Sequence, residues 1–109
     1  MSHPVMKSSL SLQRRHLLEL GQQVFFGRVE GLPVRDAQPV LEPMPRVVRE
    51  HRFPGENKPR PEWTKDEFAL KTQWIELFQL FDEMRDGIID VLEFKHGLPF
   101  RVFAAEGGA

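Results

Sequence analysis

The chain has 109 residues, a formal net charge of -1 and no cysteine. This length fits a single domain over residues 1–109 that buries a modest core, and the charge excludes nucleic-acid binding driven by overall charge alone. The lack of cysteine excludes a disulfide framework and thiol chemistry. No apolar run approaches the roughly 18 residues of a membrane span, and no signal-peptide pattern opens the chain, so we expect a cytoplasmic protein without membrane contact.

Residues 8–42 predict a helix followed by a β-hairpin. Leucines and a valine recur at helical spacing up to Val24. Residues 25–35 are rich in β-branched and aromatic side chains broken by glycine, Asp36 and Ala37 offer a turn, and an extended run resumes at Pro39.

The segment 43–62 is rich in proline and in basic residues. It holds five of the nine prolines, so we predict a linker or a long ordered loop in which RVVREHRF forms at most a short strand or helical turn. Its exposed Arg46, Arg49 and Arg52 are candidate contacts to a partner or to nucleic-acid phosphates. Interleaved glutamates favour the alternative, a solvated loop.

Residues 63–103 repeat the helix and hairpin pattern. Thr64 and Glu67 fit a capping box, which predicts a helix from there to about Met84. Its aromatic stripe of Trp74, Phe78 and Phe81 is expected in the core. A hairpin follows, in which alternation places Phe100 and Val102 on the same face.

A shift of 60 residues aligns the two halves. Seven identical pairs then coincide: Leu10/Leu70, Gln13/Gln73, Leu17/Leu77, Leu20/Leu80, Gly27/Gly87, Leu32/Leu92 and Pro39/Pro99. Shared apolar periodicity would account for the leucines, but it explains the glycine and proline pairs poorly. We expect the glycines at helix C-termini, where φ is positive, and the prolines at strand starts. The predicted fold is α+β, with two tandem α-β-β units, residues 8–42 and 63–103, packed as a four-stranded antiparallel sheet with both helices on one face.

A stretch of the first half, LLELGQQVFFGRVEGLPVRDAQPVLE (residues 17–42), resembles the YezD-like small bacterial proteins of unknown function. The shared pattern is an apolar helix, an aromatic-Gly-x-Val strand, a valine strand with a tight turn, and a return strand ending in a hydrophobic-Glu pair. Ala37 stands where that pattern has glycine, and Pro33 interrupts the first strand. The resemblance implies the helix and hairpin only, and no activity.

Residues 76–94 resemble an EF-hand. Oxygen ligands fall at loop positions 1, 5, 9 and 12, which are Asp82, Asp86, Asp90 and Glu93. Position 3 is Met84, a thioether unsuited to a hard cation, and the strand-like pattern beyond Leu92 conflicts with an exit helix. We therefore expect no metal and no cofactor, and keep calcium binding as an alternative.

Signatures of catalysis are missing from the sequence. The four histidines have no partner at metal-ligand spacing, and no nucleophile motif or phosphate-binding glycine loop occurs. We expect a non-catalytic module for protein interaction or oligomerisation, acting on a protein partner or on a second copy of itself. Binding of nucleic acid through the basic segment is the second hypothesis.

Overall fold

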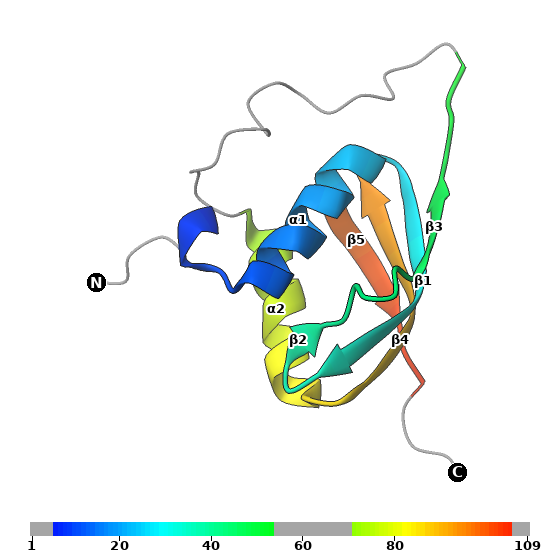
Figure 1. Ribbon diagram of the computed structural model, residues 1–109. Helices are drawn as coiled ribbons and strands as arrows, with labels where there is room; N and C mark the ends of the chain where they lie inside the picture. Colours follow the sequence, from blue (N-terminus) through cyan, green and yellow to red (C-terminus); the bar gives the residue numbers. More distant parts are fainter. Residues whose placement is uncertain (1–5, 54–70, 106–109) are drawn as a thin grey trace.

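The computed structural model describes residues 6–53 and 71–105, which form an α+β structure with two helices and a curled antiparallel sheet (Figure 1). The predicted class is confirmed at this level. The elements are the short helix η1 (Lys7–Ser9), α1 (Leu12–Val24), β1 (Gly27–Arg35), β2 (Gln38–Pro39), β3 (Arg46–Arg49), α2 (Thr72–Met84), β4 (Gly87–Lys95) and β5 (Leu98–Phe103). In the described part of the chain, no helix is both long and apolar enough to cross a membrane.

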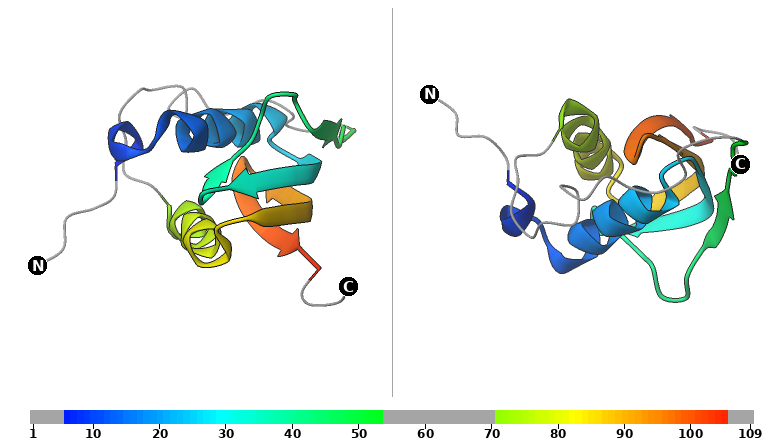
Figure 2. Two further views of the ribbon diagram at one scale, coloured as in Figure 1. Left: turned by 60° about the horizontal axis from the view of Figure 1, so that its bottom comes forward. Right: turned by 90° about the horizontal axis from the view of Figure 1, so that it is seen from above.

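The centre of the sheet is the antiparallel ladder between β1 and β4, which runs from the pair Gly27 and Phe94 to the pair Val34 and Gly87. The strand order is β2-β1-β4-β5. β3 pairs with β1 on the edge away from β4, the edge that β2 also uses further along (Figure 2).

The core combines buried side chains of α1, α2, β1 and β4. Its buried side chains are Leu17, Leu18, Val24, Val29, Leu32, Val34, Trp74, Leu77, Phe78, Phe81, Ile89, Leu92 and Phe94. The predicted aromatic stripe of α2 is thus confirmed as core. Such apolar burial is the main term that stabilises a domain of this size.

Both helices begin later than the sequence predicted. Ser11 caps α1 by accepting a hydrogen bond from the Arg14 amide at 3.2 Å, so the helix starts at Leu12 instead of residue 8. α2 starts at Thr72, and its preceding residue Lys71 is extended, so no continuous helix runs from residue 64 to Met84. The predicted capping box at Thr64 lies outside the described residues.

Of the two glycines after the helices, Gly27 has a positive φ of 156° and Gly87 does not, but neither glycine has the C-cap conformation that ends its helix. Phe25 and Arg85 take that conformation instead, at φ 65° and 62°, and each donates its amide to the helix. In addition to its positive φ, Gly27 permits close packing, because a Cβ built there would lie 2.2 Å from the Val48 carbonyl oxygen in β3. The bare backbone lets β3 approach β1 closely.

The basic segment is more than a linker, since β3 lies within it and adds a fifth strand to the predicted four. β2 is correspondingly short, at two residues. Pro43 and Pro45 follow it, and because proline cannot donate to a ladder, the chain leaves the sheet here and returns as β3.

Candidate functional site

The outer face of the sheet, opposite the core, carries paired charges. Glu30 of β1 binds two guanidiniums, from Arg28 at 2.7 Å and from Arg46 of β3 at 3.2 Å. The hydrogen bond from Arg28 holds the pKa of Glu30 below its ordinary value. Desolvation opposes this effect, and the charges of Arg28 and Arg46 add to it. A second pair joins Arg101 of β5 to Glu93 of β4.

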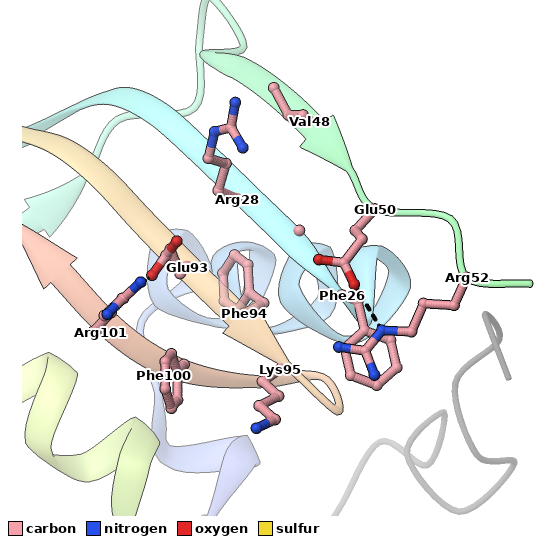
Figure 3. Close-up of a pocket in the computed structure, with 11 residues that line it drawn as sticks. Phe26, Arg28, Val48, Glu50, Arg52, Glu93, Phe94, Lys95, Phe100 and Arg101 are labelled. Carbon is pink, nitrogen blue, oxygen red and sulfur yellow. Dashed lines mark hydrogen bonds and ion pairs between the residues drawn. The ribbon is translucent and has the colours of Figure 1, made fainter. Parts of the chain in front are cut away.

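A hollow of about 390 Å³ opens on this face, at the end of the sheet where β1 begins (Figure 3). Its charged lining comprises four cations and two carboxylates: Arg28, Arg52, Lys95, Arg101, Glu50 and Glu93. A chain of net charge -1 therefore concentrates positive charge around this hollow.

Aromatic rings lie among these cations. The Arg101 guanidinium is 5.4 Å from the centroid of Phe100 and 5.3 Å from that of Phe103, and the Lys95 ammonium is 5.3 Å from Phe100. Arg52 stacks closer still, 3.7 Å over the ring of Phe26. The arrangement provides cation–π contacts on an accessible surface.

Alternation predicted Phe100 and Val102 on the same face, but Phe100 is exposed whereas Val102 packs against the core. The β4–β5 register slips between Glu93 and Phe94, so that Phe94 faces Pro99 while Glu93 faces Arg101. Phe100 is the extra residue of this β-bulge and is 57% exposed. Simple alternation could not reveal the bulge, because the inserted residue shifts the period by one, and the sequence Phe100-Arg101-Val102 itself alternates regularly.

The three arginines predicted as contacts are not gathered into one surface. Arg46 and Arg49 lie on opposite faces of β3, since Arg46 pairs with Glu30 whereas Arg49 donates to the Gln23 carbonyl at the end of α1 at 3.0 Å. Arg52 lines the hollow and binds Glu50 at 2.7 Å. Of these three arginines, only Arg46 and Arg52 contribute to the outer face.

The four acids of the EF-hand hypothesis are also separated in their roles. Asp82 binds Arg14 of α1 at 2.6 Å, and Asp86 accepts the Asp36 amide at 3.0 Å. Asp90 and Glu93 belong to β4, a strand where an EF-hand needs its exit helix. Within residues 6–53 and 71–105, no three His, Cys, Asp or Glu side chains are grouped to hold a metal ion.

The outer edges of the two central strands, β1 and β4, are covered to different extents. Along β1 the edge away from β4 is covered at residues 27–30 by β3 and at Val34 and Arg35 by β2. β5 covers β4 only from Val91 to Lys95. In the described residues, no strand pairs with the outer edge of residues 87–90, which we call the open edge.

Comparisons with known proteins do not assign this chain to a family. No protein-family model matches the chain, no curated protein is significantly similar to it, and no solved structure matches its fold. The resemblance to the YezD-like proteins stays a prediction.

Proposed function

We propose that this chain is a non-catalytic protein-binding module that takes an extended segment of a partner onto its open edge. The observation that carries the proposal is that no described strand covers the outer edge of residues 87–90, whereas β3 covers the corresponding stretch of β1. A strand edge presents unpaired N–H and C=O groups, and proteins that bind peptides by strand addition use such edges.

Exposed apolar side chains near the open edge support the same proposal. Ile88, within the edge, is 53% exposed, and Phe103, the last residue of β5, is 49% exposed. Large apolar side chains left on the surface around an unpaired strand are typical of an interaction site. An added strand would bury Ile88 through its cross-strand neighbours.

We also infer that residues 8–42 and 63–103 are tandem α-β-β units with both helices on one face of the sheet. The bounds of α1 and α2, and those of β1 and β4, differ by 60 residues at each end. Two hydrogen bonds of 2.8 Å follow the same shift: Ala37 N–H donates to the Arg85 carbonyl, and Gly97 N–H donates to the Phe25 carbonyl. Each turn thus contacts the helix end of the other half, as a pseudo-two-fold arrangement requires.

Photo-crosslinking in the native host tests the function. A photoreactive amino acid at Ile88 is expected to join the chain to another polypeptide, whereas the same group at Gln79, an exposed position on α2, is the matched control. A cross-linked product identified as a second copy would make the module an oligomerisation element. Equal yields at the two positions, or none at Ile88, would refute the proposal.

A second candidate is binding of single-stranded nucleic acid on the outer face. The specific observation in its favour is the cluster of Phe100 and Phe103 around Arg101, with Lys95 beside it, since aromatic and guanidinium groups stack bases while cations contact phosphates. Fluorescence anisotropy with a labelled oligonucleotide tests it. We expect affinity that falls with salt and with Arg101→Ala, and salt-independent or absent binding would exclude it.

A further inference from the structure

We propose that the open edge selects a basic, apolar segment, in which a Lys or Arg lies opposite Asp90 and apolar residues lie opposite Ile88 and Ile89. This inference rests on the proposed function and names the chemistry of the partner. Three features carry it: the way β3 occupies the equivalent stretch of β1, the charges that flank the open edge, and the bare backbone of Gly87.

β3 is a template for an added strand. It pairs antiparallel with residues 27–30, so that Arg46 lies opposite Glu30, Val47 opposite Val29, and Arg49 opposite Gly27. Arg46 anchors the strand through the ion pair with Glu30 at 3.2 Å. The sequence of the strand, Arg-Val-Val-Arg, therefore places an apolar pair between two cations.

The open edge offers the same chemistry at matching positions. A shift of 60 residues places Asp90 where Glu30 lies and Ile89 where Val29 lies. Ile89 is buried like Val29, and Asp90 is exposed. Among the described residues Asp90 forms no ion pair, so its carboxylate is free for an incoming cation.

Negative charge is present at both ends of the open edge. Asp90 lies at one end and Asp86 directly precedes Gly87 at the other. The Asp86 carboxylate already accepts the Asp36 amide, but this hydrogen bond leaves its charge in place. A segment with cations at both ends, as in β3, matches this distribution, whereas an acidic segment would be repelled.

Gly87 has no side chain at the position that corresponds to Gly27, where β3 approaches β1 closely. At Gly27 a Cβ would strike the Val48 backbone oxygen of β3 at 2.2 Å, which shows how near the covering strand comes. At Gly87 the described neighbour of a built Cβ is the terminal methyl of Met84 at 2.7 Å, the mobile end of a flexible side chain. The open edge thus has a bare backbone where a docked strand would need it.

The test uses a peptide with the sequence of residues 44–51, MPRVVREH, titrated into the ¹⁵N-labelled full chain. We expect amide shifts centred on residues 87–90 and little change at residues 27–30, which β3 already covers. A peptide with both arginines changed to glutamate should bind about tenfold more weakly, since two attractions become repulsions.

Three variants of the chain sharpen the result. Asp90→Asn should reduce the affinity for the basic peptide and leave the charge-reversed peptide no weaker. Gly87→Val should block both peptides, and Glu83→Gln, which removes an exposed acid on α2, is the control that should change neither. Circular dichroism of each variant verifies that it is folded.

The outcomes separate this inference from the proposed function. Equal binding of both peptides at residues 87–90 would overturn the basic chemistry while supporting strand addition. If neither peptide shifts residues 87–90 at millimolar concentration but Ile88 cross-links to a partner, the predicted segment is wrong and the function stands. If Ile88 also fails to cross-link, both fall.

Discussion

Gly27→Ala and Gly87→Ala form a matched pair that tests why β3 lies where it does. Both glycines follow a helix by the same number of residues and open the two central strands. At Gly27 a Cβ would meet the Val48 carbonyl oxygen at 2.2 Å, a methyl carbon of Val24 at 2.8 Å and the Arg49 Cα at 3.0 Å. The φ of 156° there disfavours a side chain as well, so that hydrogen exchange in β3 is needed to separate the two causes. At Gly87 the obstacle is the end of the Met84 side chain.

The expected magnitudes follow from these contacts. A Cβ at 2.2 Å requires β3 to move by about 1 Å or to detach, and overpacking of this kind costs roughly 1–3 kcal/mol. If β3 detached instead, the loss of unfolding free energy would be similar, since β3 contributes a few exposed ladder hydrogen bonds worth about 1 kcal/mol each. We expect Gly27→Ala to lose about 2–3 kcal/mol of unfolding free energy, and Gly87→Ala to change it by less than about 1 kcal/mol.

Urea denaturation of both variants measures these free energies, and hydrogen exchange of the Val47 and Val48 amides reports whether β3 remains paired. Gly27→Ala should lower the protection of these amides by more than that of the β1–β4 ladder. Equal losses in the two variants, or a Gly27→Ala chain with normal protection in β3, would refute the reasoning that close approach of β3 explains the glycine.

Four further substitutions have defined outcomes. Gly21→Ala would place a Cβ 2.5 Å from the Phe94 ring, so despite its better helix propensity it should cost about 1–2 kcal/mol in thermal unfolding. Arg14→Ala removes the 2.6 Å ion pair between the helices and should cost about 1–2 kcal/mol, whereas Asp82→Ala, at the exposed end of that pair, should cost less. The pKa of Glu30 is lower in the folded state, so its ionised form stabilises the fold above the unfolded-state pKa, and this contribution is lost as pH falls through the folded-state pKa. The difference in unfolding free energy between wild type and Glu30→Gln should therefore shrink on acidification. A difference that grows would contradict this argument.

Local sequence patterns predicted the elements that depend on interactions between residues close together in the chain. Alternation and turn residues predicted both hairpins, with turns at Asp36-Ala37 and His96-Gly97, and helical spacing predicted both helices. The helix starts were placed too early, because apolar spacing continues upstream while the N-cap is set by a single hydrogen-bonding residue, Ser11 in α1. The bounds of α1 and α2, and those of β1 and β4, differ by the same 60 residues that align the two halves of the sequence.

Features that depend on distant parts of the chain were not predictable in this way. Whether residues 46–49 join the sheet depends on a match with β1, which no local pattern encodes. The exposure of Phe100 depends on a bulge in the register of β5 against β4. The sequence indicated Asp90 only as a candidate calcium ligand. Its position at the open edge depends on where β5 ends, which is opposite Val91.

Each hairpin turn donates a hydrogen bond to the helix end of the other half, and this reciprocal pairing has a consequence for cooperativity. The Ala37 amide is satisfied by the Arg85 carbonyl and the Gly97 amide by the Phe25 carbonyl, both at 2.8 Å. If one half opened alone, the other would be left with an unpartnered turn amide and one side of the central ladder exposed. Local opening of either half is therefore coupled to the other, and the molecule should melt in one transition with no half-folded species populated.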